Sequence, residues 1–435
     1  MTEQKKGVLE KLSAINPILL ADYFVKLTPR ITLRVARALN KKDFGLSLIE
    51  MTDEQREEIL RKLQDKEIAQ ILNVLVSDDA TDIVNSLEKA RVKRILKLLK
   101  PEKLEEIKQL LRFGEETAGG LMQSEFVAVK AGDTVKKAIE KIREEKHIEE
   151  LHNVFVLKGR GELVGIVPLR KLVVAQPNEK ISSLMEKEIV SVKSNVDQEE
   201  VVSVFKENSL VSMPVLDCQN RMLGVITADD ILGVVEEEAT EDILRLAGVD
   251  EEENIFSSPL ASIKRRTPWL AFNLLIVMVS ASVIGLFEDT IATVLVLAIF
   301  LPVVANLGGN AGTQTLAVMV RSLALGEIGE KEYKRALKKE VTVGLMNGLI
   351  IGTLLLLIAV AWKGQLMIGV VLFLAMLANQ LTAAVGGTLV PLLFKWRKID
   401  PALASSVIIT GMTDIMGFLA FLGIATLFLQ MGLLA

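Results

Sequence analysis

Five long apolar spans occupy most of residues 264–435, at 268–287, 291–320, 341–362, 366–394 and 402–433. Each is long enough to cross the hydrocarbon core of a bilayer, which is about 30 Å thick. Because lipid cannot hydrogen-bond to exposed backbone groups, apolar segments of this length cross a membrane as helices. We therefore expect the second part of the chain to be a bundle of five transmembrane helices.

Basic residues between these spans predict the orientation of the bundle. Three precede the first span, six lie between the second and third, and three lie between the fourth and fifth, whereas the opposite side has only Lys363. Short loops rich in Lys and Arg stay in the cytoplasm, so we expect a multi-pass cell-membrane protein with its N-terminus inside and its C-terminus outside. The start of the chain, MTEQKKGVLE, lacks the apolar core of a signal peptide, which agrees with that orientation.

The charge of the chain is divided unevenly. Residues 1–263 hold 38 basic and 47 acidic residues, whereas residues 264–435 hold 13 and 8. An acidic first part argues against nucleic acid as a partner and favours cations. One cysteine and two histidines exclude an internal disulfide and give little support to a transition-metal site, which leaves hard cations with oxygen ligands.

Glycines and amides interrupt the second span within LPVVANLGGNAGTQTL, at 301–316. We expect this stretch to be a broken helix, and unwound backbone at membrane depth persists only where protein buries it or where it lines a water-filled path. The alternative is that the small residues Gly308, Gly309 and Gly312 let two helices pack closely.

Asp414 is the only ionisable side chain well inside a predicted span. Placing a carboxylate there costs about 2.5–3.5 kcal/mol on insertion scales, so such residues usually face the bundle interior or water and mark a pathway. Thr410 and Ser406 precede it by four and eight residues and extend one polar stripe along the helix. No intramembrane base is present to pair with it, although a protonated, hydrogen-bonded Asp414 is an alternative.

Short helical segments about a dozen residues apart fill residues 15–112, from LADYFVKL to LEEIKQLL. Each is too short to be stable alone, so we expect them to stack into a helical superhelix. The loop SDDATD at 77–82 concentrates Asp78, Asp79 and Asp82. These carboxylates either cap the following helix or bind a cation.

Residues 122–232 contain a β-α-β-β-α unit twice, about 60 residues apart. The pattern resembles a tandem pair of cystathionine-β-synthase (CBS) domains. In that family an adenine nucleotide often lies in a cleft beside a Thr or Ser and an Asp, which Thr227 and Asp230 match here. The first repeat has GIVPLRKL at this place and lacks both groups, so the resemblance allows one site for ATP as a regulatory ligand.

Acidic residues concentrate again in the segment 229–253, which leads into the first apolar span. On a helix, Glu237 and Glu241 are neighbours, and Glu238 is a neighbour of Glu241 and Asp242, so their like charges repel by a few tenths of a kcal/mol per pair. Cations would relieve that repulsion. The alternative is a solvated acidic face.

The complete order of segments resembles the MgtE family of magnesium channels and transporters. The motifs that carry this resemblance are PVVANLGGNAGTQ at 302–314, EEEATEDILRLAGV at 236–249, DPALAS at 400–405, TDIMGF at 413–418 and EETAGGLM at 115–122. The resemblance implies a homodimer whose pore lies between the second and fifth spans, with Asp414 as the ion-binding aspartate and Asn310 near it. It also implies a plug helix that closes the pore when intracellular Mg²⁺ fills regulatory acidic sites.

The expected domains are an N-terminal helical repeat at 1–118, CBS domains at 119–182 and 183–234, an acidic plug helix at 235–263 and the membrane domain at 264–435. The expected pore residues are Asp414, Asn310, Thr410, Ser406 and Gly309. The expected regulatory residues are Asp229, Asp230, Glu237, Glu238, Glu241, Asp242, Asp78, Asp79 and Asp82.

The predicted function is Mg²⁺ uptake. A membrane-anchored CBS sensor of Mg²⁺ or nucleotide, and a transporter of Mn²⁺, Co²⁺ or Ca²⁺, remain alternatives, and the residues do not separate channel-like flow from coupled transport. An enzyme is not expected, because no nucleophile with a base, phosphate loop or metal triad is found.

Overall fold

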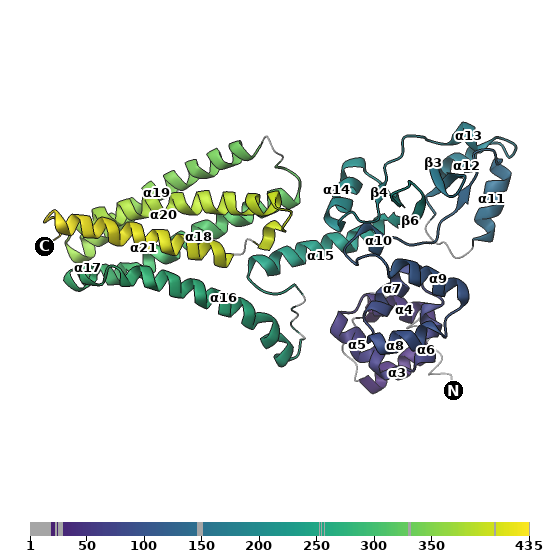
Figure 1. The fold of residues 1–435 in the computed structure, drawn as a ribbon, viewed down its shortest axis with the longest axis horizontal. Coiled ribbons are helices and arrows are strands. Elements are labelled where there is room, and N and C mark those ends of the chain that lie inside the picture. The colour runs from purple at the N-terminus through teal and green to yellow at the C-terminus, as the bar shows by residue number, and fades with distance from the viewer. Residues whose placement is uncertain are drawn as a thin grey trace. The chain divides into compact units, whose positions relative to one another are not determined.

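A computed structural model describes residues 19–21, 24, 29–145, 151–251, 253, 255, 257–328, 332–403 and 406–434. The chain forms two compact units that divide after Val235. Figure 1 shows the elements of each unit. His147, one of the two histidines, lies outside the described residues.

Short helices build the first part of the first unit. They are α3 (Pro29–Ala38), α4 (Lys41–Ile49), α5 (Asp53–Lys62), α6 (Asp65–Leu72), α7 (Ser77–Asn85), α8 (Lys89–Leu96) and α9 (Pro101–Leu110). Local signals fix their starts: Asn40 accepts a hydrogen bond from Lys42 N, Gln64 and Glu67 form a capping box, and Pro101 occupies the first turn of α9. One shared apolar core, which includes Phe44, Leu48, Ile68 and Leu72, stabilises helices that are too short to be stable alone.

Two three-stranded sheets follow in the same unit, after the short helix α10 (Ala118–Leu121). The first contains β1 (Ala128–Val129), β2 (Asn153–Lys158) and β3 (Glu162–Pro168), and the second contains β4 (Val192–Lys193), β5 (Ser212–Leu216) and β6 (Met222–Thr227). In each sheet the first pairing is parallel and the second is antiparallel. Helices α11 (Val135–Glu144), α12 (Leu169–Val174), α13 (Ile181–Leu184) and α14 (Gln198–Asn208) complete the two repeats.

The two sheets pack against each other through side chains from both. Phe155 of the first sheet shares an apolar cluster with Leu216, Met222 and Val225 of the second. Asn153 Nδ2 also donates to Ser212 Oγ at 2.9 Å. The tandem CBS arrangement expected from the repeated pattern is therefore confirmed.

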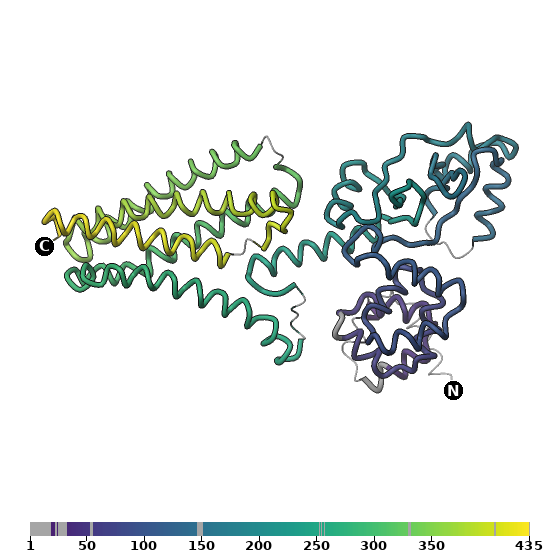
Figure 2. The backbone as a smooth tube through the Cα atoms, viewed as in Figure 1, coloured from purple at the N-terminus to yellow at the C-terminus, as the bar shows by residue number. Residues whose placement is uncertain are grey.

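A single helix, α15 (Ala228–Leu246), begins directly after β6 and continues past the division after Val235. Its first turn contains Asp229 and Asp230, and its later turns contain the glutamates of the acidic segment. The tube in Figure 2 follows this helix without interruption.

Among its described residues, the second unit contains five helices that are long and apolar enough to cross a membrane. They are α16 (Pro259–Gly285), α18 (Val296–Ala324), α19 (Tyr333–Lys363), α20 (Leu366–Trp396) and α21 (Ser406–Gln430), with the short α17 (Glu288–Thr293) and η1 (Pro401–Leu403) between them. Helix α20 packs against α18, α19 and α21 and is the most buried of the five. The pore residues expected from the sequence lie on α18 and α21, which contact each other directly.

The second span is not a broken helix, so this expectation was wrong. Helix α18 is continuous through Gly308, Gly309 and Gly312. Each glycine faces a neighbouring side chain so closely that an added Cβ would meet it: Asn379 at Gly308, Thr410 at Gly309 and Ile409 at Gly312. Glycine inside a helix costs about 1 kcal/mol relative to alanine, but here it allows close packing while the helix keeps its backbone hydrogen bonds in lipid.

Candidate functional site

The polar stripe expected on the fifth span is present on α21. Asp414 is half-buried and lies one turn after Thr410, which in turn lies one turn after Ser406. Thr410 Oγ1 donates to the carbonyl of Val407 at 3.1 Å. Within the described part of the chain, Asp414 has no hydrogen-bond or ion-pair partner. The alternative of a protonated Asp414 that is hydrogen-bonded to a neighbouring side chain is therefore not observed.

Helix α18 brings its glycine segment against this stripe. A Cβ added at Gly309 would lie 3.0 Å from Thr410 Cγ2, so the two helices touch one turn before Asp414. Asn310 follows Gly309, is exposed in the single chain, and donates from Nδ2 to Asn306 Oδ1 at 2.9 Å. The structure thus places Gly309 beside Thr410 but joins Asn310 to its own helix and not to Asp414.

One buried acid of the helix bundle was missed by the sequence reasoning, because Glu340 precedes the predicted third span by one residue. Helix α19 begins earlier, at Tyr333, and the Glu340 side chain is only 6% exposed. It accepts hydrogen bonds from Lys339 Nζ at 2.5 Å and from Thr315 Oγ1 at 3.5 Å. A sequence signal for Glu340 does exist: it lies four residues before Gly344 and eight before Gly348, so all three share one face of a helix. The two glycines lie on the face of α19 that packs on α20.

Carboxylates from two distant segments meet in the first unit. Asp78 and Asp79 occupy the first turn of α7, and Asp229 and Asp230 occupy the first turn of α15. Burial and then the charges of Asp230 and Asp79 raise the pKa of Asp78 well above its usual value. Burial, Asp230, Glu50 and Asp229 raise the pKa of Asp79 to about 6. We call Asp78, Asp79, Asp229 and Asp230 the first acidic cluster.

Capping of α7 by these carboxylates, the alternative considered above, is not observed, because its N-cap is Val76 without a side-chain hydrogen bond. Asp78 Oδ1 is instead buried without a hydrogen-bond partner among the described residues. A buried acceptor without a donor is costly and suits a cation or a proton. Asp82 lies one turn further along α7, where its backbone carbonyl accepts from Ser86 N.

Thr227 and Asp230, the residues matched to a nucleotide site, bond to each other. Thr227 donates to Asp230 Oδ2 from its backbone N at 3.0 Å and from Oγ1 at 2.5 Å, and Oγ1 also contacts Asp229. Thr227 is 2% exposed. In this structure the two residues therefore act as the cap of α15.

A second acidic cluster lies in the second unit, where Glu238, Glu241 and Asp242 of α15 approach Asp400. Burial raises the pKa of Glu241 to about 8. The charge of Arg245 opposes this shift, and the charges of Glu251, Glu238 and Asp400 add to it. Burial, Asp400 and Glu238 raise the pKa of Asp242 to about 6.

One guanidinium holds much of this second cluster together. Arg245 pairs with Glu241, Glu251 and Asp400. Glu237 lies on the exposed side of the helix. The structure therefore brings Glu238, Glu241 and Asp242 together and leaves Glu237 facing outward.

Neither cluster has the compact geometry of a closed metal site. No three His, Cys, Asp or Glu side chains of the described residues are grouped so that they could ligate one metal ion. The clusters are better described as concentrations of negative charge, two of whose acids have pKa values of about 6.

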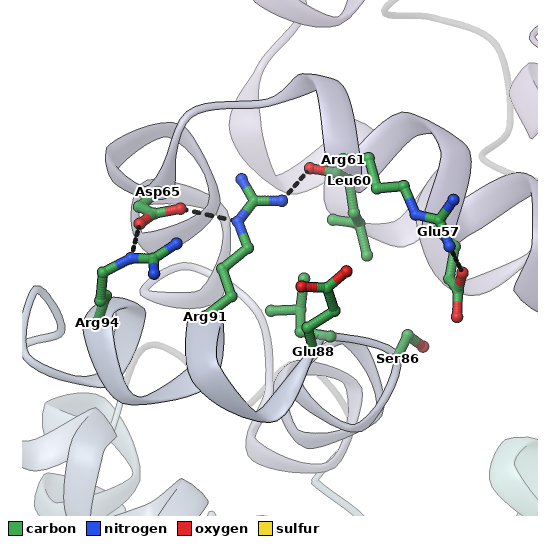
Figure 3. A pocket seen from close by; sticks show the side chains of 9 residues that line it. Glu57, Leu60, Arg61, Asp65, Ser86, Glu88, Arg91 and Arg94 are labelled. Atoms are coloured by element: carbon green, nitrogen blue, oxygen red, sulfur yellow. Dashed lines mark hydrogen bonds and ion pairs between the residues drawn. The ribbon is translucent and has the colours of Figure 1, made fainter.

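A cavity of about 410 Å³ in the N-terminal helices is not a third acidic site. Its Asp65 accepts from Arg91 Nε at 2.8 Å and from Arg94 Nε at 3.0 Å, which holds the pKa of Asp65 below its usual value. Arg91 also donates to the carbonyl of Leu60 (Figure 3). These bonds tie the end of α5 to α6 and α8.

Comparison with known proteins finds family matches along most of the chain. Residues 301–424 match MgtE, described as a divalent cation transporter, residues 15–116 match the MgtE intracellular N domain, and residues 118–178 and 181–237 match CBS domains. The magnesium transporter MgtE of Enterococcus faecalis is 34% identical over 330 residues, which are 76% of this chain and 73% of that protein. MgtE of Thermus thermophilus is 34% identical over 333 residues, 76% of this chain and 74% of that protein.

A solved structure supports the same assignment for the first part of the chain. The cytosolic domain of the Mg²⁺ channel MgtE in complex with ATP has a TM-score of 0.51 and 30% identity, over 53% of this chain and 94% of that one. Together with the five apolar helices, these matches show that the chain belongs to the MgtE family of divalent cation transporters.

Proposed function

We propose that the chain transports Mg²⁺ across the cell membrane, through a pore in which α18 and α21 of two copies face each other. The observation that carries this proposal is Asp414, a half-buried carboxylate within an apolar span that has no partner among the described residues. An acid in such a place usually marks an ion path. The relatives in E. faecalis and T. thermophilus are named magnesium transporters, which supports Mg²⁺ as the cargo.

The chemistry of the stripe suits a hydrated ion. Mg²⁺ sheds its water reluctantly and usually contacts proteins through one or two carboxylates and its retained waters. One Asp414 from each copy would supply two carboxylates, and Thr410 and Ser406 would offer hydroxyls to the water shell. Asn310 is exposed in the single chain, which leaves its amide oxygen available to a second copy.

The packing of α18 on α21 would set the width of this path. Gly309 and Gly312 allow α18 to approach Thr410 and Ile409 without a side chain between them. The glycines therefore shape the space beside the carboxylate by bringing helices close, and the helix stays intact.

The acidic clusters would supply the control of the pore by internal Mg²⁺. All their donors are carboxylate oxygens, the ligands that Mg²⁺ prefers, and the unpartnered Asp78 Oδ1 fits a cation. The residues that would hold regulatory ions are Asp78, Asp79, Asp229 and Asp230 in the first unit and Glu238, Glu241 and Asp242 in the second. A bound cation would supply positive charge that relieves the repulsion within each cluster.

Several weak sites are sufficient for such control. Moving an equilibrium from 1:99 to 99:1 requires about a 10⁴-fold preference, near 5.5 kcal/mol. About four sites, each preferring the closed state tenfold, supply that preference. Two spread clusters fit this requirement better than one tight site does.

ATP is a second candidate regulatory ligand, at Thr227 and Asp230. The related cytosolic domain is described in complex with ATP, which supports it. In the present structure, however, both residues already bond to each other at the start of α15. Nucleotide binding would have to share or replace those bonds.

The proposed orientation rests on the basic loops. Arg321 lies in the last turn of α18 and Lys339 in the first turns of α19, whereas Glu288 and Asp289 lie in α17. The positive-inside rule predicts that the N-terminal unit is in the cytoplasm and the C-terminus outside. Internal Mg²⁺ would then reach both acidic clusters.

Cation uptake into liposomes that contain the purified protein tests the proposal. Uptake of Mg²⁺, Mn²⁺, Co²⁺ and Ca²⁺ is measured at fixed voltage, with and without Mg²⁺ on the side of the soluble unit. We expect Mg²⁺ uptake that falls when Mg²⁺ is present on that side. A membrane-anchored sensor would give no uptake of any of the four cations, which would refute transport.

A further inference from the structure

A buried amide on α20 lies between the two helices that we propose as pore walls. Asn379 is 0% exposed, and its Nδ2 donates to the carbonyl of Val304 on α18 at 2.9 Å. Its Oδ1 is buried with no hydrogen-bond partner among the described residues. A buried acceptor left without a donor is costly, and an apolar side chain would fill the site without that cost, so packing alone does not require an amide here.

The amide fills the space left by two glycines on different helices. A Cβ added at Gly308 of α18 would overlap the Asn379 amide, and one added at Gly417 of α21 would lie 2.6 Å from Nδ2 and 3.2 Å from Oδ1. Both glycines are buried. Asn379 therefore occupies one junction of α18, α20 and α21, where no side chain from either neighbour separates it from their backbones.

This junction lies close to the proposed ion path. Gly417 follows Asp414 by three residues and so lies about one turn along α21, and Gly308 directly precedes Gly309, which touches Thr410. A change in the thickness of the Asn379 side chain would therefore alter the distance between α18 and α21 beside the carboxylate. Small displacements of this kind have large effects where an ion must be held in a defined geometry.

We propose that Asn379 is a positioning residue of the pore: its amide sets the separation and register of α18 and α21 and thereby the selectivity of the path at Asp414. This inference rests on the proposed transport function. The Asn379 amide contacts the helices that would line the ion path and is not proposed as a ligand of the ion.

The neighbouring residue provides a matched control. Gln380 is also a buried amide on α20, 4% exposed, and donates from Nε2 to the carbonyl of Leu307 on α18 at 3.3 Å. It packs against Gly344 and Gly348 of α19, away from Gly308 and Gly417. Loss of its amide removes one interhelical hydrogen bond of the same kind without touching the junction.

The test compares Asn379→Leu with Gln380→Leu in the full chain in liposomes, with the ratio of Mg²⁺ to Ca²⁺ uptake as the readout. Leucine has the same branching at Cγ as asparagine but is bulkier and has no donor for Val304, so we expect Asn379→Leu to reduce the ratio about tenfold. Gln380→Leu should leave the ratio unchanged. An unchanged ratio in Asn379→Leu, or an equal change in both variants, would overturn the inference.

A second pair of variants keeps the inference testable if Asn379→Leu does not fold. Gly417→Ala should reduce the ratio by crowding the amide, whereas Gly423→Ala on the same helix should leave it unchanged, because nothing lies within 4 Å of its added Cβ. An unchanged ratio in Gly417→Ala, or an equal change in both variants, would also overturn the inference. Absence of any Mg²⁺ uptake by the parent protein would instead refute the proposed function.

Discussion

Replacing Gly309 by alanine tests whether the approach of α18 to α21 controls transport. The new Cβ would lie 3.0 Å from Thr410 Cγ2, several tenths of an ångström closer than an ordinary carbon contact. Overpacking by one methyl group in a close-packed interior costs about 1–3 kcal/mol, and a gap this small places the cost near 1 kcal/mol. Moving α18 away from α21 relieves that cost and displaces the polar stripe beside Asp414, so we expect Mg²⁺ uptake per folded protein to fall about five- to tenfold.

A compensating change makes the reasoning specific. Thr410→Ser removes the methyl group that the alanine would meet and keeps the hydroxyl of the stripe, so the double variant should recover most of the uptake. Gly423→Ala, on the same helix as Thr410, is the control, because nothing lies within 4 Å of its added Cβ. Uptake is measured in liposomes and normalised to protein that elutes as a single folded species. Parent-like uptake by Gly309→Ala, or no recovery in the double variant, would refute the packing argument.

Three further outcomes follow from the charged groups. Arg245→Ala removes the shared cation of a partly buried carboxylate cluster. We expect the free energy of unfolding to fall by about 1–2 kcal/mol, a value between those for breaking exposed and fully buried ion pairs. A melting temperature equal to that of the parent, measured in chelator, would contradict this. Because the folded pKa of Asp79 is raised from 3.8 to about 6, the folded state binds more protons, so stability should fall as pH rises through that window. The gain in melting temperature from added Mg²⁺ should then be larger at pH 7.5 than at pH 5, and an equal gain at both would count against the cluster. Glu340→Ala should cost about 0.5–1.5 kcal/mol by removing the acceptor of the long hydrogen bond from Thr315, whereas Glu340→Gln keeps an acceptor and should melt close to the parent. Equal melting of the two variants would exclude the role of that hydrogen bond.

The architecture was predictable because each part has a strong local signal. Long apolar runs predicted α16, α18, α19, α20 and α21, and the repeated strand and helix pattern predicted the two sheets. The stripe of Ser406, Thr410 and Asp414 follows directly from helical spacing. These features depend on periodicity, which the sequence displays.

The state of α18 was not predictable from glycine content. Glycines at Gly308 and Gly312 are compatible with a broken helix and with close packing, and only the neighbours decide between them. Those neighbours, Asn379 and Ile409, come from helices that lie about 70 to 100 residues further along the chain. Nothing in the local pattern indicated which residues would meet the glycines.

Long-range charge pairing was likewise only partly accessible. The acids Asp78 and Asp230 were both singled out, but the influence of one on the pKa of the other depends on how α7 and α15 pack. The pairing of Arg245 with Asp400 was not anticipated, because the two residues are 155 positions apart.

The central claim is that Asp414 binds the transported ion, and its replacement by asparagine tests this most directly. Asparagine keeps the shape of the side chain and removes its charge. Asp289→Asn, an exposed acid of α17 outside the spans, is the matched control. Mg²⁺ uptake is measured for both in liposomes. The account predicts a loss of at least about tenfold in Asp414→Asn, equal to 1.4 kcal/mol, and none in the control. Near-normal uptake by Asp414→Asn with unchanged selectivity would contradict it.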